Sequence, residues 1–278
     1  MLIECVPNFS EGRDGAVVAR LREAIAAHAQ VLDITSDADH NRSVITFAGA
    51  PEAVEQAAME AARAAIETID LRTHTGVHPR IGAIDVIPFV PISGASLEDC
   101  AAIAYRVARE LWKRFHLPSF FYDAAGAGRG LEDVRRAALA CAAPDTGEGR
   151  HPTAGVAAIG ARKFLVAWNV LLDSNDLPLA KSIAKKIRYS SGGFPGVKAL
   201  GFALEVRGCV QVSINSTDFE ATGLQQIFDA VAREANGKIH GAELIGLIPQ
   251  RALEGTNLPW INFDPAKVLE TAIQTKIE

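Results

Sequence analysis

The chain has 278 residues, of which 49% are hydrophobic and 22% are charged, a composition typical of a globular protein with an extensive core and not of a disordered chain. Its formal net charge is -5 and no basic run occurs, which argues against nucleic acid as a partner. No apolar run approaches the ~20 residues of a membrane span, and no basic stretch precedes an apolar one at the N-terminus. We therefore expect a cytoplasmic protein that does not bind membranes.

Strands and helices alternate through the first half of the sequence. Asp14 is placed to cap one helix, Pro51 to open a second, and Ser96 with Asp99 to form a capping box for a third. Runs of apolar and β-branched residues predict the strands. The predicted strands are 3–9, 31–34, 43–47, 84–90 and 119–122, and the predicted helices begin at residues 14, 51, 96 and 131.

The second half repeats this order after a stretch rich in glycine and proline. Residues 142–160 show no hydrophobic period, so we interpret them as a connection between two domains. One helix is predicted around Ile183, and Asp218 is placed to cap another. The strands predicted in this half are 164–172, 199–204, 210–214 and 244–248.

Both halves then follow the order β-α-β-β-α-β. This order predicts an α/β (α+β) fold of two duplicated ferredoxin-like sandwiches, with a ligand groove between them. The predicted domains are 1–160 and 161–278. Two short matches, of 6–8 with 167–169 and of 84–88 with 245–249, share one offset along the chain. They favour an internal repeat over a chance match of apolar strings.

The densest group of polar side chains lies in residues 73–85, THTGVHPRIGAID. Histidine both takes and gives a proton near neutral pH, and Pro79 stiffens the backbone directly after His78. His78 is therefore a candidate acid/base residue, although this short motif alone is weak support. His74 and His78 also have H-x-x-x-H spacing, but Gly76 and Pro79 disfavour the helix that would bring both to a zinc ion. We predict no metal site.

Three further polar stretches allow either a functional or a structural interpretation. Asn41 and Arg42 suit a carboxylate ligand but also an ordinary polar turn. The glycine-rich loop 146–155 could present backbone N–H groups to a flat or anionic ligand, or be a plain linker. It does not fit the nucleotide-binding patterns. Gln211 and Asn215 alternate with Ser213 between them, so all three share one strand face, which suits a polar cleft or a solvated surface.

Several long segments carry a specific resemblance. They are ECVPNFSEG, HNRSVITFAG, THTGVHPRIGAIDVIPFVP, HPTAG with GARKFLVAWNVLL, and QVSINSTDFEAT. In this order they resemble glutamate formiminotransferase, which is the transferase half of the bifunctional formiminotransferase-cyclodeaminase of histidine breakdown and a free-standing enzyme in bacteria. The resemblance runs from residue 3 to about residue 252 and is weak beyond Leu253.

This resemblance implies two α/β subdomains with tetrahydrofolate, a co-substrate, in a groove between them. It implies that the formimino group of N-formimino-L-glutamate is transferred to N5 of tetrahydrofolate, giving 5-formiminotetrahydrofolate and L-glutamate without a metal. His78 matches the catalytic histidine of the family, and we expect a homodimer. The folate-binding residues that the resemblance implies are Gly147, Gly149, Arg150, His151, Thr153 and Gly155.

The implied chemistry assigns roles to the remaining polar residues. His78 would collect the N5 proton and deliver it to the leaving nitrogen. Because the donor is a dicarboxylate, Arg42, Arg80 and Arg150 are candidate anchors. Further candidate substrate-binding residues are Asn8, Glu11, Asn41, Asp85, Gln211 and Asn215. Three alternatives stay open: a related transferase that uses formylglutamate, a folate-binding paralogue without catalysis, and a metallohydrolase built on His74 and His78.

Overall fold

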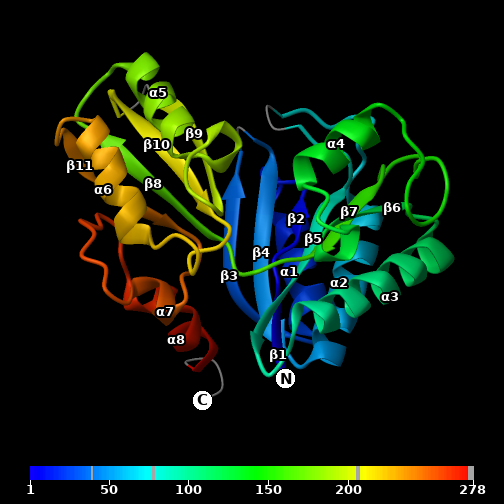
Figure 1. The fold of residues 1–278 in the computed structure, drawn as a ribbon. Helices are drawn as coiled ribbons and strands as arrows, with labels where there is room; N and C mark the ends of the chain where they lie inside the picture. The colour runs from blue at the N-terminus through cyan, green and yellow to red at the C-terminus, as the bar shows by residue number, and fades with distance from the viewer. Residues whose placement is uncertain (39, 77–78, 205–206, 275–278) are drawn as a thin grey trace. The chain divides into compact units, whose positions relative to one another are not determined.

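The computed structural model of the protein describes residues 1–38, 40–76, 79–204 and 207–274. The chain divides into two compact units, Met1–Lys163 and Phe164–Glu278. Each unit contains one β-sheet with helices packed on it, which confirms the expected mixed α/β class (Figure 1). No helix in the described part of the chain combines the length and the apolar character that a membrane crossing needs.

A seven-stranded sheet forms the centre of the first unit. Its strands are β1 (Leu2–Cys5), β2 (Asn8–Phe9), β3 (Gln30–Asp37), β4 (Arg42–Gly49), β5 (Ile84–Ser93), β6 (Ser119–Asp123) and β7 (Ala157–Ala161). β3 pairs with β4, β1 and β2 lie between β4 and β5, and β7 separates β5 from β6. The strand predicted at 3–9 is interrupted at Pro7, which lacks an N–H to donate.

In the described part of the first unit, four α-helices cover this sheet, and the first three start at the predicted signals. They are α1 (Gly15–Ala26), α2 (Pro51–Thr68), α3 (Leu97–Phe115) and α4 (Leu131–Leu139), and a short 3₁₀ turn, η1 (Ala124–Gly126), follows β6. Asp14 caps α1, Pro51 is the first residue of α2, and Ser96 forms the expected capping box with Asp99 at the start of α3. The first three helices share a core on one face of the sheet, whereas α4 packs with a smaller cluster on the other (Figure 1).

The interpretation of residues 142–160 as a connection between domains is wrong. β7 lies inside the first sheet, parallel to both β5 and β6, and all of its residues are buried. A Cβ at Gly160 would lie 2.5 Å from the ring of Tyr122. Apart from Ile159 the strand consists of alanine and glycine, so it lacks the β-branched run that normally reveals a buried strand.

The second unit has a four-stranded antiparallel sheet in the order β11-β8-β10-β9. The strands are β8 (Val166–Leu172), β9 (Val197–Leu204), β10 (Cys209–Ser216) and β11 (Ile239–Ile245). The two longer helices, α5 (Leu177–Ile187) and α6 (Leu224–Glu234), pack on one face around the fully buried Trp168. A short turn, η2 (Tyr189–Ser191), follows α5, and η3 (Pro265–Lys267), α7 (Gln250–Leu253) and α8 (Leu269–Gln274) complete the unit.

Two expectations for this unit are wrong. Asp218 does not cap a helix, because α6 begins after Gly223, and the Asp218 carboxylate accepts a hydrogen bond from Ala221 N (3.2 Å) in the preceding turn. The last strand is β11 and not 244–248, since Gly246 adopts φ 72° directly after it. Of the matched string 245–249, only its first residue is therefore in a strand, and the internal repeat stays a prediction.

Candidate functional site

The two loops that the sequence singled out, 73–85 and 146–155, lie side by side in the first unit. We call them the His-Pro-Arg loop and the glycine-rich loop. Three backbone hydrogen bonds join them or their flanks: Leu71 N to Thr153 O (2.8 Å), Ala83 N to Ala154 O (2.9 Å) and Val156 N to Ile81 O (2.9 Å). Residues 71 to 82 positions apart in sequence are thereby held in one local structure.

Glycine is required where these loops meet. A Cβ at Gly82 would collide with the carbonyl oxygen of Val156, and a Cβ at Gly155 would collide with that of Ile81. Gly155 also adopts φ 71°, which side chains with a Cβ rarely tolerate. The close approach of the two backbones thus depends on two residues that lack side chains.

Two predicted folate-binding side chains in the glycine-rich loop bond to the protein backbone. Arg150 donates from Nη1 to Ala138 O (2.8 Å) and from Nη2 to Ile81 O (3.2 Å). The Nδ1 atom of His151 accepts from Ala154 N (3.0 Å), which requires a neutral imidazole. Burial, followed by the charge of His116, lowers the pKa of His151, which also favours the neutral imidazole. Both residues therefore stabilise the loop conformation.

A cavity of about 350 Å³ lies against the glycine-rich loop. Its lining is largely apolar, and Gly147, Gly149 and Arg150 of the loop reach it. The other lining residues are Phe120, Ala138, Cys141, Ala142, Ala143, Pro144, Glu148 and Val156. Gly147 packs so closely on Trp112 that a Cβ would lie 2.5 Å from the indole ring. The cavity is large enough for one aromatic ring system of a ligand.

Asp85 is the last residue of the His-Pro-Arg loop and lies at the start of β5, with 0% of its surface exposed. Its Oδ2 atom accepts from Arg42 Nη1 and from Arg135 Nη2, both at 2.8 Å. Its Oδ1 atom accepts from the backbone N–H groups of Ile81 (2.7 Å) and Gly82 (3.3 Å). Burial opposes ionisation, but the two arginines and the N–H of Ile81 outweigh it and hold the pKa of Asp85 below its usual value.

Arg42 is held by this carboxylate and by Asn8. Its Nε and Nη2 atoms donate to Asn8 Oδ1 at 3.2 and 2.9 Å, and the Asn8 amide donates in turn to Val6 O (3.0 Å). Asn8 lies on β2 between the strands that carry Arg42 and Asp85. The guanidinium of Arg42 is thus fixed by protein groups on two sides.

Glu11 and Asn41 organise the loop that precedes α1. Glu11 Oε1 accepts from the three successive backbone N–H groups of residues 12–14, at 2.8 to 2.9 Å. Asn41, at φ 48°, accepts from Gly12 N (2.9 Å) and donates to Thr75 O (3.0 Å). These residues connect the start of α1 and the β3–β4 turn to the His-Pro-Arg loop, whereas Gly147 and Gly149 lie beside the cavity at the glycine-rich loop.

Arg80 and His74 are in contact within the His-Pro-Arg loop. Arg80 Nη1 lies against the ring nitrogens of His74, and Arg80 Nη2 donates to His40 O (3.2 Å). Burial, followed by the charge of Arg80, lowers the pKa of His74 and favours its neutral form. A Cβ at Gly76 would lie 2.5 Å from Arg80 Nη2 and from His40 O. His78, the predicted acid/base, lies outside the described residues.

Positive charge predominates in this cluster. The charges of Arg80 and Arg135 both act on Arg42, and the buried carboxylate of Asp85 is the counter-charge of this group. This excess attracts anionic ligands despite the negative net charge of the chain. No feature of the sequence distinguishes Arg135 as a site residue, because on α4 it stands among charged residues that are typical of a solvated helix face.

In the second unit, Gln211 and Asn215 lie with Ser213 on the face of β10 opposite the helices, as their alternation predicts. Ser213 is the register partner of Asn169 on β8, which in turn is the partner of Glu243 on β11. The Asn169 amide donates to Glu243 Oε2 at 3.4 Å. A polar row therefore crosses three strands of this sheet.

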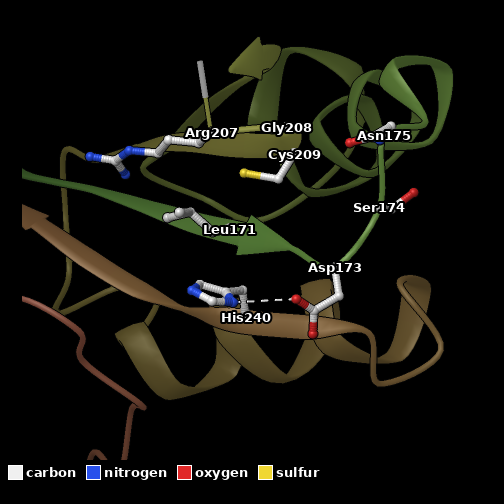
Figure 2. A pocket seen from close by; sticks show the side chains of 8 residues that line it. All are labelled: Leu171, Asp173, Ser174, Asn175, Arg207, Gly208, Cys209 and His240. Carbon is white, nitrogen blue, oxygen red and sulfur yellow. Dashed lines mark ion pairs between the residues drawn. The ribbon is translucent and has the colours of Figure 1, made fainter. Parts of the chain in front are cut away.

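A cavity of about 600 Å³ at the end of the same sheet contains none of the predicted residues. Figure 2 shows Asp173 and His240 facing each other in it, with Oδ1 and Nδ1 3.3 Å apart. Its lining residues are Leu171, Asp173, Ser174, Asn175, Arg207, Gly208, Cys209 and His240. Within the described ranges of the chain, no group of three or more His, Cys, Asp or Glu residues is placed to hold a metal ion.

Comparisons with known proteins cover both units. The family model described as the formiminotransferase domain, N-terminal subdomain, matches residues 2–162, and that described as the formiminotransferase domain matches residues 167–277. The sequence alone suggested that the similarity ends near Leu253, but the second match shows that it continues to residue 277.

Curated relatives agree with these matches. A glutamate formimidoyltransferase from Streptococcus pyogenes serotype M1 is 40% identical over 91% of this chain and 90% of its own length. One from Thermoplasma acidophilum is 36% identical over 98% of this chain and 97% of its own. The formimidoyltransferase-cyclodeaminase of Sus scrofa is 38% identical over 91% of this chain, but only 51% of its own length is matched.

Proposed function

The chain belongs to the formiminotransferase family, and from this premise we propose how its residues serve the reaction. The chain is a glutamate formimidoyltransferase that transfers the formimino group of N-formimino-L-glutamate to tetrahydrofolate. The observation that supports a site in the first unit best is the junction of the His-Pro-Arg loop and the glycine-rich loop. This junction supports a site to which the His-Pro-Arg loop contributes the catalytic residue and the glycine-rich loop binds folate.

The reaction needs one proton to move. A bond forms between N5 of tetrahydrofolate and the formimino carbon, and the bond from that carbon to the glutamate nitrogen breaks. N5 loses one proton and the leaving glutamate nitrogen gains one, so a single acid/base group that carries the proton from one to the other is sufficient. We assign this role to His78, and general acid–base catalysis of this kind contributes ~10²–10⁴-fold to the rate.

The donor is a dicarboxylate, and we assign its binding to the positive cluster around Asp85. Arg42 and Arg150 already bond to protein groups, so they act by their charge and by holding the loops in place. Arg80 is hydrogen-bonded as well, to His74 and to His40 O, but it lies on the His-Pro-Arg loop itself, two positions from His78 in the sequence, and is the anchor that we favour. Asn8 holds the guanidinium of Arg42, and Glu11 and Asn41 fix the backbone at residues 12–14 and at Thr75.

We assign the folate to the glycine-rich loop. The apolar cavity beside Gly147 and Gly149 suits one of its flat rings, and nothing lies within 4 Å of a Cβ at Gly149, so the backbone there is open to a ligand. Thr153 and Gly155 lie at the junction with the His-Pro-Arg loop. We further propose that Gln211 and Asn215 bind polar groups of a substrate, and that the enzyme is a homodimer in the cytoplasm without a metal.

The test mixes purified protein with tetrahydrofolate and formiminoglutamate, and follows glutamate release by the wild type and by His78→Ala. We expect turnover by the wild type and a drop in kcat of at least ~10²-fold in the variant. Activity that survives the substitution would leave the family assignment in place and reject His78 as the acid/base. Activity that is lost on treatment with a chelator would favour a metallohydrolase instead.

The donor itself needs a second assay. Formylglutamate differs from formiminoglutamate by one oxygen in place of the imino nitrogen, so a related formyltransferase would fit the same site. Release of glutamate from formiminoglutamate and not from formylglutamate supports our proposal, and the reverse preference rejects it. Micromolar binding of tetrahydrofolate without turnover of either donor would identify a folate-binding protein without catalysis.

A further inference from the structure

Arg135 reaches the His-Pro-Arg loop from a different part of the first unit. It lies on α4, the helix that covers the face of the sheet opposite α1, α2 and α3 (Figure 1). Its Nη2 atom donates to Asp85 Oδ2 at 2.8 Å, and only 18% of its side chain is exposed. The next residue, Arg136, is 77% exposed and pairs with Asp133 on the surface of the same helix.

Asp85 connects Arg135 to the backbone of the His-Pro-Arg loop. One of its oxygens is held by Arg135 and Arg42, and the other accepts hydrogen bonds from the backbone N–H groups of Ile81 and Gly82. These two residues directly follow the His-Pro-Arg motif in the sequence. The position of the carboxylate therefore determines where the backbone leaves that motif.

Neutralising Asp85 does not require both arginines. Arg42 alone balances its charge, yet Arg135 lies beside it with 18% of its side chain exposed, and the buried Nε atom of Arg135 has no acceptor within the described ranges of the structure. A buried donor without an acceptor is unfavourable, and protein sites tend to keep such costs where they serve function. The second arginine comes from α4 and not from β4, so it adds a restraint on the same carboxylate oxygen from a different element.

We propose that Arg135 is a positioning residue of the formimino transfer: through Asp85 it fixes the backbone of Ile81 and Gly82, and with it the exit of the His-Pro-Arg motif. This inference rests on the proposed function. Arg135 touches neither substrate in this role, so its loss lowers the rate of the transfer step more than the affinity for either substrate.

The experiment compares Arg135→Ala, Arg135→Lys and the matched control Arg136→Ala. We expect Arg135→Ala to lower kcat by ~10- to 100-fold with KM values within ~3-fold of the wild type, because small misplacements of a catalytic loop have effects of this size. Low-millimolar guanidinium should restore part of the activity of Arg135→Ala, and Arg135→Lys should be intermediate. Arg136→Ala should behave like the wild type.

Hydrogen exchange of the Ile81 and Gly82 amides separates this inference from the proposed function. If the wild type turns over, a wild-type kcat in Arg135→Ala, or a loss that matches that of Arg136→Ala, overturns the inference. If the wild type does not turn over, the proposed function fails, and the exchange decides the inference by itself. Faster exchange at these two amides in Arg135→Ala, but not in Arg136→Ala, supports the positioning role, and unchanged exchange rejects it.

Discussion

Arg42 and Asp85 form an ion pair of 2.8 Å across the width of β2, with the carboxylate fully buried and only 11% of the arginine side chain exposed. Asn8, on the strand between them, accepts two further hydrogen bonds from the same guanidinium. The pair thus connects the turn that begins β4 to the start of β5, which follows the His-Pro-Arg loop. The Asp85 carboxylate is therefore important both for the stability of the first unit and for the geometry of the candidate site.

Asp85→Asn should strongly destabilise the protein. The substitution keeps the shape of the side chain but leaves Arg42 and Arg135 buried without a counter-charge, which costs about 3–5 kcal/mol in comparable cases. Urea unfolding followed by circular dichroism measures the change in the free energy of unfolding. Asp133→Asn, at an exposed pair with Arg136, is the control and should change it by less than ~1 kcal/mol. Equal effects at both sites would contradict the importance of the buried pair.

Gly76→Ala should reduce activity by at least ~10-fold. The new Cβ would lie 2.5 Å from the carbonyl oxygen of His40 and from the guanidinium of Arg80, so the His-Pro-Arg loop must shift. Gly15→Ala is the matched control, since nothing lies within 4 Å of its Cβ, and helix propensity favours alanine there. Steady-state kinetics of both variants test this, and wild-type activity in Gly76→Ala would show that the loop tolerates the displacement.

Gly155→Ala and Gly149→Ala should differ although both residues adopt positive φ. The two substitutions carry a similar backbone strain of about 1 kcal/mol. A Cβ at Gly155 would also collide with the carbonyl of Ile81, whereas nothing lies within 4 Å of one at Gly149. We expect Gly155→Ala to separate the two loops and to lose most of its affinity for tetrahydrofolate, measured by calorimetry. A larger loss in Gly149→Ala would instead indicate direct contact of Gly149 with folate.

Glu4→Gln should change how stability depends on pH. Burial, partly offset by Arg162, raises the pKa of Glu4 from 4.5 to about 7, and its Oε2 atom has no hydrogen-bond partner among the described residues. Between these pH values the folded state binds a proton that the unfolded state has released, so the free energy of unfolding falls as pH rises through this window. Glutamine carries no such proton.

The variant should therefore match the wild type near pH 4.5 and exceed it at pH 8 by about 3 kcal/mol, which corresponds to the shift in the pKa. Thermal unfolding at a series of pH values measures both. A constant difference between the two proteins across this range would mean that Glu4 ionises normally in the folded state.

The sequence alone determined the features that depend on neighbours along the chain. Asp14, Pro51 and Ser96 set helix starts because a cap bonds to backbone groups only a few positions away. The alternation along β10 placed Gln211 and Asn215 on one face for the same reason, since successive side chains of a strand point to opposite sides. The class of the fold followed from the order of these local elements.

Tertiary structure alone decided the relationships between distant residues. β7 is a strand because Ala157–Ala161 fit between β5 and β6 beside Tyr122, although their sequence has no strand pattern. In the sequence Arg135 looks like its solvated neighbours, and only the packing of α4 shows that it bonds to Asp85, 50 residues away in the chain. Such contacts depend on packing between segments whose separation in sequence carries no information about their separation in space, whereas caps and strand alternation need only the geometry of the local backbone.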